Sequence, residues 1–201
     1  MKVIKINPNN PHPDILTESV KCLSAGGTLV YPTDTCYGLG ADMLNPIAVN
    51  KIYKIKNRQD RKPLSLIIRN ISQLKKYAFV ENKQELILKR HLPGQFTFVL
   101  LSINYDIFKQ SSVGIRMPNY KFTKLLSDKF SNPYCTTSAN ISGHEPCYDI
   151  NCILKQFTNA QAQPNLILDA GQLPKNLPST VVDLTNWPPN IIRQGAEKLI
   201  I

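Results

Sequence analysis

Short apolar segments of strand-like composition alternate with helical segments along the whole chain, and this alternation restricts the folds that it can adopt. Residues 96–101, FTFVLL, form a β-branched and aromatic run that is typical of a buried strand. Residues 13–25 repeat apolar side chains at helical spacing, begin at a proline and end at Gly26-Gly27. The alternation predicts an α/β or α+β fold with a mixed sheet.

The same patterns place the individual elements. We expect eight or nine strands, at residues 2–6, 28–31, 64–68, 96–101, 113–116, 134–138, 166–169, 181–184 and 191–193. We expect four or five helices, among them residues 13–25, 46–56, 83–91 and 120–130. Residues 31–40, YPTDTCYGLG, remain as a polar loop that is longer than the two to five residues of a plain turn, which leaves open whether they are a loop or a site.

Composition is that of an ordinary globular protein, with 42% hydrophobic and 19% charged residues in 201. No apolar run reaches the roughly 18 residues of a membrane span, and the N-terminus lacks the apolar core of a signal peptide, so we expect a cytoplasmic protein. The five cysteines contain no CxxC pair and the three histidines are scattered. We therefore expect no metal site and reduced thiols.

The net charge is +10, from 24 Lys and Arg against 14 Asp and Glu. Such a charge favours polyanionic partners, whether a nucleotide, a nucleic acid or both, and it also fits a merely well-solvated basic surface. The standard nucleotide loops are absent: there is no GxxxxGK[ST], and Met43 stands where a dinucleotide fingerprint needs Gly or Ala. A bound nucleotide would therefore lie outside those loops.

Four polar clusters stand at or just after predicted strands. They are residues 31–40, the basic run 51–63, TTSANISG at 136–143, and PSTVVD at 178–183 with Arg193 close behind. Each cluster alone also fits a helix end, a turn or a cap. Together they offer the hydroxyl, amide and guanidinium donors that hold phosphates and carboxylates. No nucleophilic triad or carboxylate pair is evident, so positioning and charge stabilisation are favoured over covalent catalysis.

The ordered blocks TLVYPTDTCYGLGAD, KIYKIKNR, KPLSLII, LPGQFTFVL, VGIRMP, TTSANISG, PSTVVD and IIRQGA closely resemble the YrdC/Sua5 family, the threonylcarbamoyl-AMP synthases. They extend from about residue 28 to 195, and the length resembles the short bacterial TsaC type. The resemblance implies one YrdC-like domain over residues 1–201 without the C-terminal Sua5 domain. It also implies a twisted, mixed and mostly parallel sheet with flanking helices around a basic concave cavity.

The resemblance further implies an L-threonylcarbamoyladenylate synthase, a nucleotidyltransferase that uses L-threonine, bicarbonate or CO2, and ATP. The product serves t6A formation at position 37 of tRNAs reading ANN codons, through the partner proteins TsaD, TsaB and TsaE. Mg2+ is expected to arrive on the ATP phosphates, with no tightly bound cofactor. The alternative is a non-catalytic protein that binds double-stranded RNA or tRNA, and direct tRNA binding stays open.

The site residues follow from the matching positions. The resemblance assigns L-threonine binding to Thr35, Arg116, Thr136 and Ser179. It assigns ATP binding to Lys56, Arg58, Lys62, Ser112, Ser138, Asn140, Pro146 and Arg193. Lys56 and Arg58 form the K-x-R motif and are expected to act catalytically on phosphate oxygens, while Arg116 is expected to hold the threonine carboxylate.

Three positions depart from the family pattern. Ile67 replaces a common histidine, so one substrate contact is missing or supplied elsewhere. Gln59 replaces a proline, and Cys36 replaces a valine. The role of Asp34 stays open, because the sequence does not distinguish a loop-orienting role from contact with the substrate amine.

Overall fold

The computed structural model describes residues 1–58, 63–108 and 110–201. Its strands are β1 (Lys2–Lys5), β2 (Thr28–Pro32), β3 (Tyr37–Asp42), β4 (Ser65–Ile67), β5 (Phe96–Leu101), β6 (Ser112–Arg116), β7 (Tyr134–Ser138), β8 (Leu166–Asp169), β9 (Thr180–Asp183) and β10 (Asn190–Arg193). Its helices are α1 (Pro13–Ser24), α2 (Pro46–Ile55), α3 (Ile71–Leu74), α4 (Asn82–His91), α5 (Tyr105–Phe108), α6 (Lys121–Lys129) and α7 (Ile150–Phe157). None of the described helices is long and apolar enough to cross a membrane.

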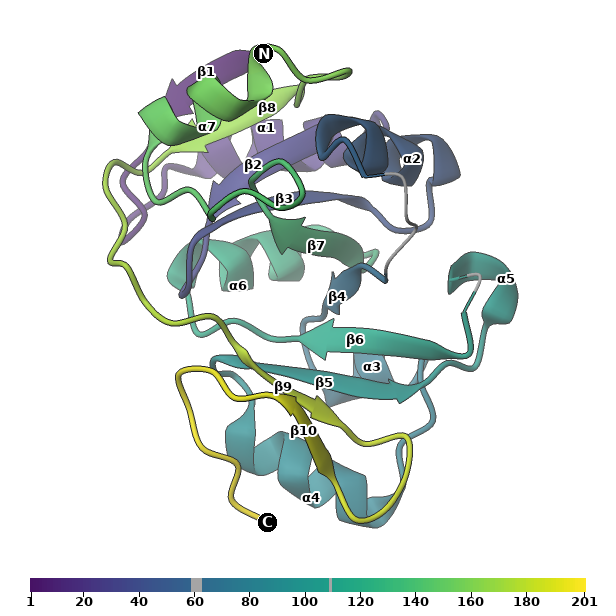
Figure 1. Cartoon of the computed structure of the whole chain (residues 1–201). Coiled ribbons are helices and arrows are strands. Elements are labelled where there is room, and N and C mark those ends of the chain that lie inside the picture. The colour runs from purple at the N-terminus through teal and green to yellow at the C-terminus, as the bar shows by residue number, and fades with distance from the viewer. Residues whose placement is uncertain (59–62, 109) are drawn as a thin grey trace.

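The strands form one sheet in the order β1-β8-β2-β3-β7-β4-β6-β5-β9-β10. In Figure 1, β1, β8, β2 and β3 lie in one half with α1, α2 and α7, and β5, β9 and β10 lie in the other with α4. The α/β class and the mixed sheet are confirmed. The parallel share is smaller than expected: among the described strands four pairings are parallel and five are antiparallel. Short connections such as β2–β3 and β9–β10 make hairpins, and hairpins are antiparallel.

Apolar residues gather in clusters on the sheet. Ile52 of α2 and Ile153 of α7 pack with Leu39, whereas Leu16 of α1 and Phe122 of α6 pack in a separate cluster. A further cluster joins α3 and α4 to alternate residues of β5 and β6, namely Phe96, Phe98, Leu100, Val113 and Ile115. Because side chains alternate along a strand, the intervening residues of β5 and β6 face the opposite side.

Residues 31–40 are not the long loop that we expected. They form most of a β2–β3 hairpin whose connection is residues 33–36. The reason is a cross-strand fit between Tyr31 and Gly38, which are register partners. Tyr31 is fully buried, and a Cβ at position 38 would lie 3.1 Å from its Cζ atom. The glycine therefore gives room to an aromatic ring, which a glycine-based loop prediction does not anticipate.

Short elements were also missed, and one of them brings two cysteines together. Residues 150–157 form α7, whose first turn is capped by the Asp149 side chain accepting a hydrogen bond from the Cys152 N–H at 2.8 Å. This turn places Cys152 5.4 Å from Cys147, measured between Cα atoms, and the two form a disulfide. The expectation that all thiols are reduced is wrong for this pair, while Cys22, Cys36 and Cys135 are free.

Candidate active site

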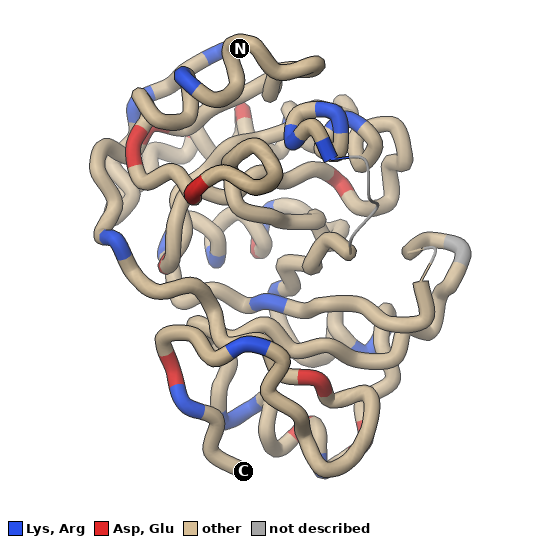
Figure 2. Tube along the Cα trace, viewed as in Figure 1, with Lys and Arg blue, Asp and Glu red and all other residues tan. Residues whose placement is uncertain are grey.

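The polar clusters meet at one cavity of about 580 Å3, which lies over the centre of the sheet. Nine of the predicted site residues line it: Thr35, Arg58, Ser112, Arg116, Thr136, Ser138, Pro146, Ser179 and Arg193. They come from segments that are far apart in the sequence but adjacent in the sheet order. Figure 2 shows basic positions on β6 and β10, two strands that contribute an arginine to this lining.

Strand alternation explains how the cavity wall is built. Thr97 and Val99 line the cavity, whereas their neighbours in β5 lie in the apolar core. On β6 the same alternation turns Ser112, Gly114 and Arg116 toward the cavity. β5 and β6 therefore turn one set of side chains toward the cavity and the alternate, apolar set into the core.

The hairpin connection supplies one rim of the cavity. The Thr33 hydroxyl accepts hydrogen bonds from the N–H groups of Thr35 at 3.1 Å and Cys36 at 3.3 Å, and donates to the Cys36 carbonyl at 2.6 Å. This local network fixes the turn. Thr35 is 5% exposed, and its Oγ1 lies 3.1 Å from Oγ1 of Thr33. Its hydroxyl is therefore held in place at the cavity.

Ser179 and Arg193 form a second rim. Arg193 donates to the Ser179 carbonyl from Nε at 3.2 Å and from Nη2 at 2.8 Å. The Ser179 hydroxyl is also hydrogen bonded to the Thr97 hydroxyl at 2.9 Å. Partial burial lowers the pKa of Arg193, and the positive charge of Arg116 lowers it further. Two arginines near enough to influence one another form a site that favours an anion between them.

Thr97 is a site residue that the sequence prediction missed. The signal was present: it is the one hydroxyl-bearing residue in the apolar run FTFVLL. A polar side chain inside a buried strand indicates an internal partner or a place at a cavity. Thr97 has a partner, the Ser179 hydroxyl, and it also lines the cavity.

Lys56 does not lie where we expected it. It is 3% exposed and is not among the residues that line the cavity. Its Nζ donates to the Ser138 carbonyl at 2.7 Å, the Asn140 carbonyl at 2.8 Å and Asn140 Oδ1 at 3.3 Å. These three acceptors match the three N–H bonds of an ammonium group. A direct contact with phosphate would require one of them to be released.

Ser138 and Asn140 form a tight turn above Lys56. The Ser138 hydroxyl donates to Asn140 Oδ1 at 2.5 Å, and Asn140 Nδ2 donates to the carbonyls of Ile141 at 3.0 Å and His144 at 2.6 Å. Ser138 lines the cavity, whereas Asn140 is 6% exposed and lies behind it. The amide of Asn140 therefore organises the turn.

The remaining predicted residues fall outside the cavity wall or outside the described chain. Lys62 and Gln59 lie beyond the residues that the structure describes. Ile67 is 2% exposed and packs in the apolar cluster with Tyr31 and Phe122. Position 67 faces the core here, so the isoleucine is compatible with its surroundings. Among the described residues no group of three His, Cys, Asp or Glu is placed to hold a metal ion.

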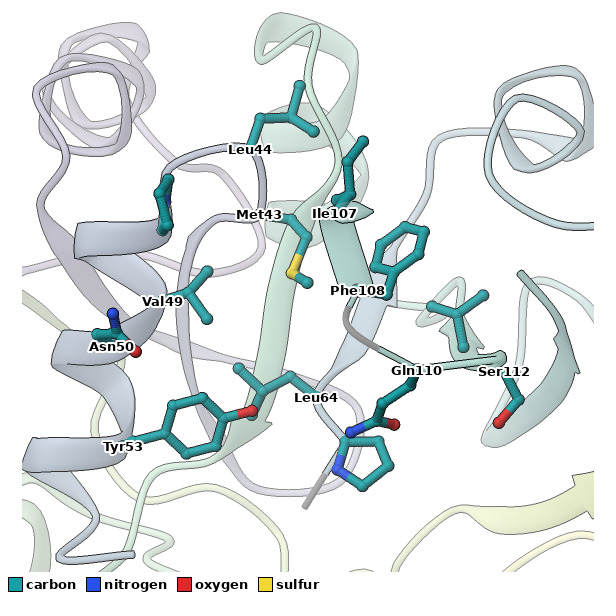
Figure 3. Close-up of a pocket in the computed structure, with 13 residues that line it drawn as sticks. Met43, Leu44, Val49, Asn50, Tyr53, Leu64, Ile107, Phe108, Gln110 and Ser112 are labelled. Atoms are coloured by element: carbon teal, nitrogen blue, oxygen red, sulfur yellow. The ribbon is translucent and has the colours of Figure 1, made fainter. Parts of the chain in front are cut away.

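A second cavity of about 550 Å3 adjoins the first, and the two share Pro63 and Ser112 in their walls. Figure 3 shows side chains directed into this space from α2, from α5 and from the segments beside α2 and β4. They are Met43, Val49, Tyr53, Leu64, Ile107 and Phe108. Its described lining contains no charged residue, whereas the first cavity contains three arginines and one carboxylate, Glu145. The volumes are similar, so charge decides which cavity suits a phosphate.

The fold and the first cavity define a class: an α/β protein with a mixed sheet and a cavity lined by arginines and hydroxyl groups. The sequence profile described as "Telomere recombination", which covers the Sua5, YciO and YrdC proteins, matches residues 21–195. The chain belongs to this family.

Its relatives carry two kinds of name. The chain is 33% identical over 198 residues to a putative threonylcarbamoyl-AMP synthase of Methanocaldococcus jannaschii, covering 96% of this chain and 93% of that protein. It is 30% identical over 195 residues to the uncharacterized protein YciO of Escherichia coli, covering 94% and 93%.

Solved structures show the same likeness. Sua5 of P. abyssi, complexed with L-threonine, superposes with a TM-score of 0.88 at 28% identity over 97% of this chain. This chain spans 58% of that Sua5 chain. E. coli YciO superposes with a TM-score of 0.86 at 28% identity over 98% of both chains. The YrdC-like fold is thus confirmed.

Proposed function

We propose that this protein is an L-threonylcarbamoyladenylate synthase. One observation carries the proposal: nine residues predicted from the sequence to bind threonine or ATP line a single cavity. The cavity contains three arginines, which suits a substrate with phosphate and carboxylate groups. A relative with this fold is complexed with L-threonine, and another is named a putative threonylcarbamoyl-AMP synthase.

The proposed reaction joins three substrates. The threonine amine adds to CO2, supplied as such or from bicarbonate, and gives a carbamate. A carbamate oxygen then attacks the α-phosphorus of ATP; the bond from that phosphorus to the bridging oxygen breaks, and pyrophosphate leaves. Negative charge builds up on the phosphoryl oxygens during this step, so fixed cations lower its barrier. Arg58 and Arg193 are the cations that we assign to the nucleotide.

The other residues position the substrates. We assign the threonine side to Thr35, Arg116, Thr136 and Ser179, and the nucleotide side also to Ser112, Ser138 and Pro146. Lys56 holds the turn of Ser138 and Asn140, so it supports the nucleotide side through these two residues. Mg2+ would reach the site on the ATP phosphates. Transfer to tRNA by partner proteins in the cytoplasm, and a single domain over residues 1–201, belong to the same proposal.

The test is pyrophosphate release by the purified protein. With ATP, Mg2+, L-threonine and bicarbonate we expect pyrophosphate and threonylcarbamoyl-AMP, both absent without threonine. Pyrophosphate at the level of the no-threonine control would contradict the proposal. RNA binding that falls steeply with salt, without any turnover, would favour the non-catalytic alternative.

A further inference from the structure

Asp34, at the tip of the β2–β3 hairpin, is directed at Arg116 and not into the cavity. Its Oδ1 accepts a hydrogen bond from Arg116 Nη2 at 3.0 Å, and its Oδ2 accepts one from the Asn119 N–H at 3.0 Å. The two side chains of this ion pair are 7% and 12% exposed. Arg116 lines the cavity, whereas Asp34 is absent from its described lining.

The backbone around Asp34 is held from two other segments. Its carbonyl oxygen accepts hydrogen bonds from Gln95 Nε2 at 2.7 Å and from Asn176 Nδ2 at 2.9 Å. The Thr33 hydroxyl fixes the turn from within. The carboxylate therefore has little freedom to move, and it holds the Nη2 end of the guanidinium that it contacts.

Arg116 has donor capacity left over. Its Nε is buried and, among the described residues, lacks a hydrogen-bond partner. A guanidinium carries five N–H groups, and Asp34 accepts a hydrogen bond from one of its nitrogens, Nη2. An unpaired buried donor is unfavourable, because it has lost its water without gaining another acceptor. A ligand with two acceptor oxygens, such as a carboxylate, would satisfy the donors that remain.

We infer that Asp34 is the positioning residue of the amino-acid subsite: it orients Arg116 so that the free N–H groups of the guanidinium meet the substrate carboxylate. This inference rests on the proposed function for the identity of the substrate. It resolves the two roles that the sequence left open for Asp34, since the carboxylate is already engaged by Arg116 and Asn119 and does not face the substrate amine. It also explains why a loop aspartate is buried.

Two consequences separate this role from a structural one. Loss of the Asp34 carboxylate should weaken the binding of L-threonine much more than the binding of ATP, because the carboxylate orients Arg116. The loss should also be confined to ligands that carry a carboxylate. L-threoninol has a hydroxymethyl group in place of the carboxylate, so its affinity should change little.

The experiment compares four proteins: wild type, Asp34→Ala, Asp34→Asn and Asp42→Asn. Asp42 is the matched control, because it lies at the other end of the same hairpin. Its carboxylate also accepts from one backbone N–H, of Leu44 at 2.9 Å, and one side chain, Asn132 at 3.0 Å. Calorimetry measures the binding of L-threonine and L-threoninol, and kinetics measures KM for threonine and for ATP.

For Asp34→Ala we expect threonine affinity to fall about 100-fold, as misplacement of a positioning group does. We expect KM for ATP within about threefold of wild type, and a threonine-to-threoninol preference that largely disappears. Asp34→Asn keeps the shape and an acceptor oxygen but lacks the charge, so its threonine affinity should fall less than that of Asp34→Ala. Asp42→Asn should match wild type.

Three results would overturn the inference: unchanged threonine affinity in Asp34→Ala, equal losses for threonine and threoninol, or an equal rise in KM for ATP. If Asp34→Ala does not fold, the same criteria apply to Asp34→Asn. The failure of the proposed function is distinguishable. Wild type that binds threonine but releases no pyrophosphate contradicts the synthase alone, whereas wild type that binds no threonine contradicts both.

Discussion

Lys56 and Asn140 are joined by two hydrogen bonds, from Nζ to the Asn140 carbonyl at 2.8 Å and to its Oδ1 at 3.3 Å. A third bond from the same Nζ reaches the Ser138 carbonyl. An ammonium group is thus buried beneath the turn that presents the Ser138 hydroxyl to the cavity. This arrangement ties the end of α2 to the end of β7, so Lys56 of the K-x-R motif and the turn of Ser138 and Asn140 are held together.

The first prediction concerns this contact. Lys56→Met removes all three donors but keeps an unbranched side chain of similar length. We expect pyrophosphate formation to fall about 100-fold, because the Ser138 turn loses its support on the nucleotide side. Steady-state kinetics checks this, with circular dichroism to confirm the fold. KM for ATP and kcat both within threefold of wild type would show that the turn is held without Lys56.

The second prediction is a pH dependence of stability. Burial lowers the pKa of Lys56 from 10.5 to about 8, with a smaller effect from the nearby charge of Arg58. Below pH 8 both folded and unfolded states carry the proton, so the cost of burying the charge is fully present. Between about 8 and 10.5 the unfolded state holds more protons than the folded state, and stability contributed by this group therefore rises with pH.

Denaturant unfolding of wild type and Lys56→Met at pH 7 and pH 9.5 tests this dependence. The variant lacks the titrating group, so subtracting its free energy of unfolding removes the contributions of other residues. We expect the free energy of unfolding of wild type, relative to that of Lys56→Met, to be about 2 kcal/mol higher at pH 9.5 than at pH 7. A difference that is the same at both pH values would contradict a depressed pKa.

The third prediction separates Arg58 from its neighbour Lys54. Arg58 lines the cavity, whereas Lys54 is exposed in the last turn of α2. Arg58→Ala should lower kcat/KM for pyrophosphate formation by about 100- to 1,000-fold, as loss of one charge-stabilising donor does. Lys54→Ala, with the same change in net charge, should stay within threefold. Equal losses in both variants would point to a general electrostatic effect in place of a site contact.

The residues that the resemblance named at the cavity also carry a local signal. Thr136 and Ser138, and Ser112 and Arg116, stand two or four positions apart in or beside predicted strands, and strand alternation places each pair on one face. Lys56 could not be placed in this way. Its burial depends on acceptors more than eighty residues away in the sequence. A lysine within a basic run is instead expected to be exposed to solvent. Hydrogen bonds between distant segments therefore decide whether this lysine is buried, and the local sequence pattern does not contain that information.

The hairpin gives the fourth prediction. Gly38→Val would put a branched side chain where even a Cβ lies 3.1 Å from Tyr31 Cζ and 3.2 Å from Thr33 Cγ2. The Tyr31 hydroxyl is hydrogen bonded to Thr136 Oγ1 at 2.6 Å and its ring is fully buried, so the ring cannot move aside freely. We expect a loss of about 1–3 kcal/mol from overpacking. Gly171→Ala, where a Cβ meets nothing within 4 Å but φ is +75°, is a control for backbone strain alone.

Thermal and denaturant unfolding measure both glycine variants. The double variant Gly38→Val with Tyr31→Leu should lose less stability than the sum of the two single variants, because the smaller side chain at position 31 frees the space next to position 38. Additive losses in the double variant would show that the two positions do not share this space.

The fifth prediction concerns the disulfide between Cys147 and Cys152, which are separated by five positions. Pro146 and Tyr148 on either side of Cys147 line the cavity, and the Cys147 carbonyl accepts a hydrogen bond from the Tyr37 N–H at 3.1 Å. Closing so short a loop restricts the unfolded chain by about 2 kcal/mol. Cys152→Ala should therefore lower Tm by about 4–8 °C in a protein of this size.

Scanning calorimetry with and without dithiothreitol tests the bond itself. Wild type should fall to the Tm of Cys152→Ala when it is reduced, and the variant should not respond to the reductant. Because Cys147 is fully buried and Asp149 still caps α7, the helix should persist in both cases. Two results would show that these two cysteines do not stabilise the fold as a pair. One is a wild-type Tm that is insensitive to dithiothreitol, and the other is a Tm of Cys152→Ala that falls on reduction as much as the wild-type Tm does.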